Sequence, residues 1–227
     1  MEQTTTIFRI GALLITDTVM TTWGIMAVLV LACWLGARHL KLAPDRWQSV
    51  MEGVVLTMQQ AIEDIAPGKS QTLLPFVGSL WIYLVFANLI GLVPGLHSPT
   101  GQLSVTSGLA ILVFFATHWF GIRDSGWLPY LRHYLQPNPI LLPFNVISEL
   151  SRTLALAIRL FGNIMSLEMA ALLVLLVAGL LVPVPLLMLH VVEALVQAYI
   201  FGVLALVYIA GSLESNPATR SDGGTPS

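Results

Sequence analysis

The sequence predicts an all-α membrane protein, with five helices that cross the bilayer and one amphipathic helix on its surface. The 227 residues are 56% hydrophobic and 10% charged, and their mean hydropathy is +0.82. These values are typical of integral membrane proteins. Long apolar runs alternate with short segments that carry most of the charges. No internal repeat divides the chain, so we expect a single membrane domain over residues 1–227.

Charge and cysteine content exclude several kinds of partner and site. A net charge of −2 provides no basic field for nucleic acid, which is therefore excluded as a partner. The one cysteine, Cys33, forms no intrachain disulfide and no multi-cysteine metal site. Basic residues follow the apolar run around Cys33 and do not precede it, so we expect a retained helix and not a cleaved export signal.

The first half of the chain predicts two helices and a hairpin. A first helix is expected over residues 18–39, which reach the ~20 residues that a crossing requires. In residues 44–66 apolar side chains recur at helical spacing while charges occupy other faces, which indicates an amphipathic surface helix. Two apolar runs, 73–93 and 103–120, are joined by "PGLHSPTGQ". Its Pro, Gly and Ser suit a tight reversal, so we expect an antiparallel hairpin.

The second half predicts two unusually long helices, at residues 141–179 and 185–212, followed by a polar tail over 213–227. At ~1.5 Å per residue the first would be ~58 Å long, against a hydrocarbon core of ~30 Å. It must therefore tilt strongly, bend, or project from the membrane. We expect the pair to form a strongly tilted hairpin.

Positive charge predicts the orientation. Lys and Arg gather on two sides of the surface helix and in one later loop, at Arg38, Lys41, Arg46, Lys69, Arg123 and Arg132. The intervening loops contain neither residue type. By the positive-inside rule the surface helix and the carboxyl terminus are cytoplasmic, and the amino terminus is outside. Trp47, Trp81 and Trp127 are expected to anchor the chain at the membrane interfaces.

A single arginine, Arg159, lies in the middle of the apolar run "LALAIRLFGNIMSLEMAALLVLLVAGLL". At ~100° per residue it shares one narrow helix face with five polar residues. These are Asn145, Ser148, Arg152, Asn163 and Ser166. Inserting a central Arg costs ~2.5 to 3.5 kcal/mol, so such a group is kept where it meets water, a partner or an ion. The alternative is a purely structural arginine, which only hydrogen-bonds to backbone carbonyls.

A second polar stripe lies on the final helix, where His190, Glu193 and Gln197 follow the spacing i, i+3, i+7. Glu168 is about 180° from Arg159 and falls at the same outer end, so it needs a partner other than the Arg159 stripe. Ser148, Glu149 and Arg152 form an inner polar group. Two polar groups with a charge between them resemble two offset half-channels. Alternatively, His190 and Glu168 are static interhelical hydrogen-bonding groups.

The segments "ISELSRTLALAIRLFGNIMSLEMA" and "LHVVEALVQAYIFGVLALVYIAGSLES" resemble the signature helices of subunit a of F-type ATP synthases, also called the ATPase A chain family. That subunit is the membrane stator of the Fo sector, against which the c-ring turns. The specific features are R-L-F-G-N, a carboxylate five residues beyond the Asn, and Q-A-[YF]-[IV]-F. The similarity extends over nearly the whole chain from about Arg46.

The resemblance implies a role for each polar group. Arg159 would be the stator charge that separates the half-channels, with Glu149, Arg152 and Ser148 at the inner one. The outer half-channel would hold Asn163, Glu168, His190, Glu193, Gln197 and, more weakly, Asn88. The chain departs from the family pattern at Gly91, Thr153 and His190. It leaves open whether His190 or Glu193 is the main relay group, and whether protons or sodium ions are carried.

The implied function is ion translocation within a larger complex. An ion would enter the outer half-channel, neutralise a c-ring carboxylate, and leave by the inner half-channel after nearly a full rotation. The sequence shows no nucleophile motif, phosphate loop or metal cluster, so we expect no catalysis by this chain alone, no cofactor and no metal. The expected partners are the c-ring, the peripheral-stalk subunit b, the F1 sector and membrane lipid. We expect a bacterial inner membrane.

Two other classes fit less well. A secondary transporter would show an inverted repeat or interrupted helices around a central substrate site. A stand-alone cation channel would be obstructed by an arginine in its path.

Overall fold

The computed structural model describes residues 6–10, 13–38, 46–92, 98–128, 130, 142–178 and 183–214. Within this part of the chain, five helices are long and apolar enough to cross a membrane, which confirms the predicted all-α membrane fold. Their spans are Thr18–Gly36, Ser70–Leu92, Leu103–Ser125, Pro143–Val174 and Leu187–Leu213.

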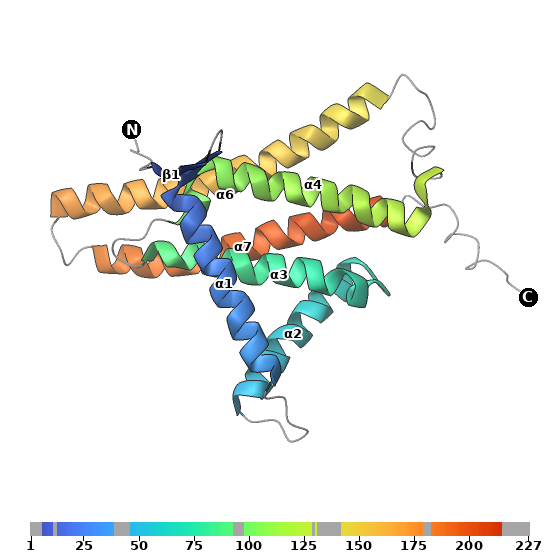
Figure 1. Cartoon of the computed structure of the whole chain (residues 1–227), viewed down its shortest axis with the longest axis horizontal. Helices are drawn as coiled ribbons and strands as arrows, with labels where there is room; N and C mark the ends of the chain where they lie inside the picture. The colour runs from blue at the N-terminus through green and yellow to red at the C-terminus, as the bar shows by residue number, and fades with distance from the viewer. Residues whose placement is uncertain are drawn as a thin grey trace, which may run out of the picture.

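The helices follow the predicted order (Figure 1). They are α1 Asp17–Arg38, α2 Arg46–Ile65, α3 Ser70–Leu89, α4 Leu103–Ser125, α6 Leu142–Ala178 and α7 Pro183–Glu214. Two 3-10 turns lie between α3 and α4, at Ile90–Leu92 (η1) and Pro99–Gly101 (η2). Helix α4 runs further than the expected 103–120. It ends at Gly126, whose φ of +82° suits glycine and breaks the helix.

A short β-hairpin precedes α1, where the sequence predicts no element. Strand β1, Thr6–Ile10, pairs antiparallel with β2, Leu13–Thr16, with Ile10 opposite Leu13. The strands "TIFRI" and "LLIT" are rich in the β-branched residues Thr and Ile, which favour extended backbone. The hairpin is an addition to the helical membrane fold and leaves the five spans unchanged.

Helices α3, α4, α6 and α7 pack together as the body of the protein, and α7 contacts all three of the others. One buried cluster joins these four helices through Leu84, Val113, Leu160 and Phe201. A second cluster joins α2, α3 and α7 through apolar side chains that include Ile62, Val77, Trp81 and Ile209. The two long helices run antiparallel and side by side (Figure 1).

The packing of α3 on α7 depends on a glycine. Trp81 stacks on Tyr199 with a centroid distance of 6.2 Å, and its indole Nε1 donates a hydrogen bond of 3.3 Å to the Tyr199 carbonyl. A Cβ atom on Gly202 would lie 1.8 Å from that Nε1. Trp81 is only 4% exposed, so its predicted role as an interface anchor is wrong. The indole fills the seam between two helices.

Helices α1 and α2 form an arm that extends away from the four-helix body (Figure 1). Only 6% of the α1 span is buried, and its large apolar residues Trp23, Val30 and Trp34 are exposed. Near the body, α2 turns into α3 through Gly68, which has a φ of +75°. The Glu63 carboxylate accepts a hydrogen bond of 2.6 Å from the Gly68 amide, which fixes this corner.

Candidate functional site

The Arg159 stripe lies along one edge of the packed face of α6. Leu156, Leu160, Ile164 and Leu167 are buried, and their mean direction is about 100° round the helix from Arg159. The polar residues of the stripe lie beside this buried face. Asn145, Ser148, Arg152, Arg159 and Ser166 are exposed, and Asn163 is half-buried. The polar stripe therefore follows the border between the packed face and the exposed apolar face of α6.

Arg159 makes no hydrogen bond or ion pair with any residue that the structure describes. Its side chain is exposed on the isolated chain, and no backbone carbonyl in the described ranges accepts from it. This geometry does not favour the alternative in which the guanidinium only satisfies backbone carbonyls. The charge is available to a group outside those ranges or outside this chain.

A direct polar contact joins the two long helices one turn from Arg159. The Asn163 side-chain amide on α6 donates a hydrogen bond of 2.6 Å to the Gln197 side-chain oxygen on α7. Gln197 is 2% exposed, and its Nε2 has no hydrogen-bond partner among the described residues. A buried amide whose NH2 group has no acceptor is costly unless water reaches it.

Asn88 and His190 lie at the junction of α3, α7 and η2. Asn88 is fully buried, and its Nδ2 donates 3.1 Å to the Ala194 carbonyl, on α7 between His190 and Gln197. His190 is 4% exposed and lies within electrostatic reach of Glu193 and the Asn88 backbone. Within the described part of the chain, His190 Nε2 lacks a hydrogen-bond partner. The structure thus brings together Asn88, His190 and the half-buried Glu193, three of the predicted outer residues.

Two polar residues at this junction escaped the sequence analysis. Thr100 Oγ1 donates a hydrogen bond of 2.7 Å to Asn88 Oδ1. Ser98 Oγ donates 2.9 Å to the Ala87 carbonyl and lies 2.7 Å from Thr100 Oγ1. The segment "HSPTG" predicted only a reversal. The hydroxyl groups of Ser98 and Thr100 were the only signal in the sequence for this junction. Both are buried, and they bond to α3.

The predicted inner group gains a histidine. His118 on α4 lies 3.6 Å from the Glu149 carboxylate, measured from Nε2 to Oε1. Its Nδ1 lies 2.9 Å from the Phe114 carbonyl. A small cavity of about 30 Å³ beside this pair is lined in part by Glu149, Arg152 and Tyr208, and it has room for one water molecule. His118 was missed because it lies on a different helix from Glu149 and at no motif spacing.

Ser148 makes no polar contact among the described residues, and its side chain is exposed. The side chain of Glu168 lies outside the described part of the structure. In the described ranges no three His, Cys, Asp or Glu side chains lie close enough to hold a metal ion, and the expectation that the chain carries no cofactor stays a prediction.

Fold and site together define a polytopic helical membrane protein whose last two helices hold buried polar side chains within apolar spans. The family model described as ATP synthase A chain matches residues 19–210. The chain therefore belongs to the ATP synthase A chain family and is an integral membrane protein.

Named relatives agree along almost the full length. "ATP synthase subunit a 2" of Pelobacter propionicus is 60% identical over 221 residues, 97% of each chain. "ATP synthase subunit a 1" of Hahella chejuensis is 59% identical over 224 residues, which cover 96% of this chain and 95% of the relative. "ATP synthase subunit a" of Legionella pneumophila strain Paris is 54% identical over 210 residues, covering 92% and 91%.

Proposed function

We propose that this chain is the ion-translocating stator subunit of a rotary F-type ATP synthase. Two offset half-channels would pass protons or sodium ions to and from c-ring carboxylates, with Arg159 between them. The observation that carries the proposal is the position of Arg159. It is exposed, has no partner among the described residues, and lies in a membrane span between two polar groups.

The outer half-channel would be lined by Asn88, His190 and Gln197 with Asn163, Glu193 and Glu168. Two buried nitrogen atoms, His190 Nε2 and Gln197 Nε2, have no partner among the described residues. Such groups are expected to be satisfied by water. A fully satisfied static network would leave no such unpaired polar atoms, so this incomplete bonding supports a hydrated path.

The inner half-channel would start beside Glu149, Arg152 and Ser148. The cavity at Glu149, with room for one water, and the nearby His118 supply groups that accept and release protons. This group lies about two to three turns before Arg159 on α6. The offset between the inner and outer groups along α6 and α7 supports two paths that do not join directly.

Arg159 would separate these two paths electrostatically. Its guanidinium stays protonated at any physiological pH, attracts an ionised carboxylate and favours release of the ion bound there. It also repels a cation that would move directly between the half-channels. Each elementary charge crossing 100 mV supplies ~2.3 kcal/mol. Because the ion would pass from one half-channel to the other only by nearly a full rotation of the c-ring, that free energy would be converted into torque.

The complex would place this chain against the c-ring, with the peripheral-stalk subunit b and the F1 sector as further partners and ATP chemistry confined to F1.

We propose a bacterial inner membrane, with the amino terminus outside and the carboxyl terminus in the cytoplasm. Labelling of a Thr4→Cys variant by an impermeant reagent from the outer side is expected. Labelling from the cytoplasmic side alone would reverse the orientation.

The decisive experiment measures ATP-driven ion uptake and passive leak in vesicles that contain the whole complex with Arg159→Ala. Arg46→Ala, which removes an exposed charge from α2, is the matched control. We expect uptake to be lost in Arg159→Ala at equal assembly, with leak raised or unchanged, and to persist in Arg46→Ala. Normal coupled uptake in Arg159→Ala would show that this charge is structural and would overturn the proposal.

A further inference from the structure

Three membrane spans end around one pocket. The α3 span begins at Ser70, the α4 span ends at Ser125, and the α7 span ends at Leu213. Between these ends lies a cavity of about 180 Å³. It is lined by Lys69, Thr72, Leu73, Phe120, Arg123, Asp124 and Leu213. A pocket at the point where apolar spans end lies at the level of lipid headgroups.

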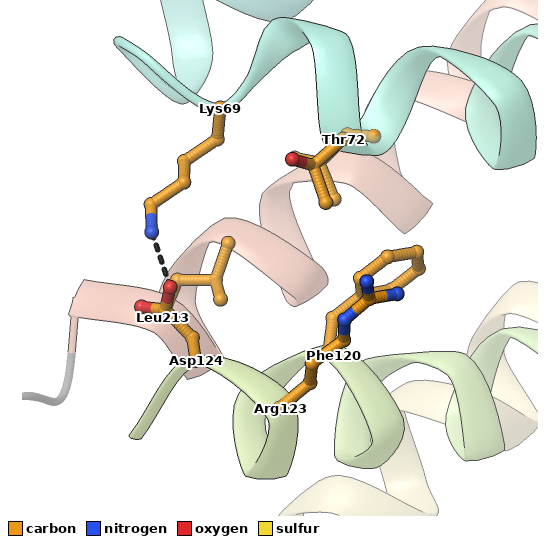
Figure 2. Close-up of a pocket in the computed structure, with 7 residues that line it drawn as sticks. Lys69, Thr72, Phe120, Arg123, Asp124 and Leu213 are labelled. Atoms are coloured by element: carbon orange, nitrogen blue, oxygen red, sulfur yellow. Dashed lines mark hydrogen bonds and ion pairs between the residues drawn. The ribbon is translucent and has the colours of Figure 1, made fainter. Parts of the chain in front are cut away.

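The pocket carries a net positive charge. Figure 2 shows Lys69 reaching from the start of α3 to Asp124 on α4, with which it forms an ion pair. The Arg123 guanidinium enters the same pocket from α4 and has no ion-pair partner among the described residues. Among the described residues that line it, two cations and one carboxylate leave one positive charge. The hydroxyl-bearing Thr72 lies on α3, across the pocket from Arg123.

An apolar groove lies next to this pocket, nearer the middle of the spans. It has a volume of about 540 Å³ and shares Phe120 with the charged pocket. Its lining is Phe76, Phe115, Ala116, His118, Trp119, Phe120 and Ile122. At ~1.5 Å per residue, Phe76 lies ~9 Å into α3 from Ser70, and Phe115 lies ~15 Å back along α4 from Ser125. The groove therefore covers the depth of one leaflet of a ~30 Å hydrocarbon core.

We propose that this pocket and groove bind one anionic phospholipid. The headgroup phosphate lies between Lys69 and Arg123, and an acyl chain follows the groove along Phe120, Phe76 and Trp119. The charged pocket is at the end of the spans and the apolar groove is deeper, which matches the order of headgroup and acyl chain in a phospholipid. Guanidinium and ammonium groups both bind phosphate, and surface cations attract anionic lipid. This inference does not rest on the proposed function, although the groove lining includes His118, which lies beside Glu149.

Substitution of Asp124 distinguishes lipid binding from a purely structural role of the Lys69–Asp124 ion pair. Lys69→Gln and Arg123→Gln each remove a cation, whereas Asp124→Asn removes the competing negative charge and leaves both cations. Native mass spectrometry of the whole complex, with added phosphatidylglycerol or phosphatidylcholine, measures retained lipid. We expect the native chain to retain phosphatidylglycerol preferentially. Each cation variant should lower that retention about five-fold, and Asp124→Asn should raise it. Arg46→Gln, a surface cation outside the pocket, should change nothing.

A photoactivatable phosphatidylglycerol with its reactive group on the acyl chain locates the lipid. We expect labelling of α4 residues 115–120, lost in Arg123→Gln. Equal loss of retention in Asp124→Asn and Lys69→Gln would mean that only the ion pair matters, and would overturn the proposal. So would competition by inorganic phosphate at the concentration of the lipid. Retention that appears only after deletion of residues 215–227 would instead assign the pocket to the chain's own tail.

Discussion

The Asn163 amide and the Gln197 side-chain oxygen lie 2.6 Å apart, which makes them a direct hydrogen bond between α6 and α7. The contact is one turn from Arg159, and it spans the seam between the two helices that carry the proposed half-channels. Because Gln197 uses its oxygen here, its buried Nε2 is left without a hydrogen-bond partner among the described residues. In the proposed function, one residue would both join the helices and supply a polar group to the outer half-channel.

This contact predicts a measurable coupling. In a double-mutant cycle of Asn163→Ala and Gln197→Ala, we expect a coupling free energy of about 0.6 to 1.7 kcal/mol, the range for hydrogen bonds within membranes. Unfolding of the purified chain in mixed micelles measures it. The pair Thr117→Ala and Ser107→Ala, two hydroxyls on α4, serves as an uncoupled control. A coupling that is indistinguishable from that control would remove the interhelical role.

The His118–Glu149 pair predicts an effect on ion release at the inner side. His118→Phe keeps a ring of similar size but removes the titratable nitrogen 3.6 Å from Glu149. We expect ATP-driven uptake to slow by roughly ten-fold or more, since positioned acid–base groups speed proton transfer by larger factors. Ser107→Ala on the same helix should transport normally. Normal rates in His118→Phe would mean that the histidine only packs against Phe114.

Gly202 predicts a steric requirement in the α3–α7 seam. Gly202→Ala would place a methyl group against the Trp81 indole, and we expect a loss of about 1 to 3 kcal/mol in the free energy of unfolding. The second change Trp81→Leu should restore part of the loss by removing the ring. Gly108→Ala, where nothing lies within 4 Å of the new Cβ, is the matched helix control. Equal stability of the two alanine variants would contradict the close approach.

Glu63 predicts a pH effect at the corner between α2 and α3. Hydrogen bonds from the Ser70 side chain and the Gly68 amide lower the pKa of Glu63 below its usual 4.5. A lowered pKa in the folded state gives stability that is present above about pH 4.5 and is lost as pH falls through the lower, folded-state pKa. We therefore expect Glu63→Gln to speed amide exchange at Gly68 and Ser70 at neutral pH. Native and variant should converge in strong acid. A difference that grows on acidification would contradict this cap.

Much of the fold follows from local patterns. Apolar run length predicts the five spans, because a bilayer crossing needs ~20 apolar residues whatever the rest of the chain does. The alternation of apolar and charged residues predicts α2 for a similar reason. The end of α4 was missed by five residues, since Arg123 and Asp124 look like loop charges in sequence. They are helical until Gly126, and they stay at the membrane boundary where charge is tolerated.

The site was predictable only in part. Helical spacing placed Arg159 and Asn163 on one face of α6, and His190, Glu193 and Gln197 together on α7. Spacing within one helix says nothing about the partner helix, so the contacts of Asn163 with Gln197 and of Asn88 with Ala194 could not be derived. His118 and Thr100 were missed for the same reason. His118 contacts Glu149 and Thr100 contacts Asn88, and each partner is at least 12 positions away in the chain.

The sequence by itself determined which segments are helical, which of them span the membrane, and which family the chain resembles. These properties depend on hydrophobicity and periodicity, which are summed along one continuous segment. The tertiary structure decided which polar groups meet across helices, and that Trp81 lies in a helix seam and not at an interface. It also brought three span ends together around Lys69, Arg123 and Asp124. Contacts of this kind depend on the rotation and spacing of packed helices, and a single residue without a side chain, Gly202, sets one of those spacings.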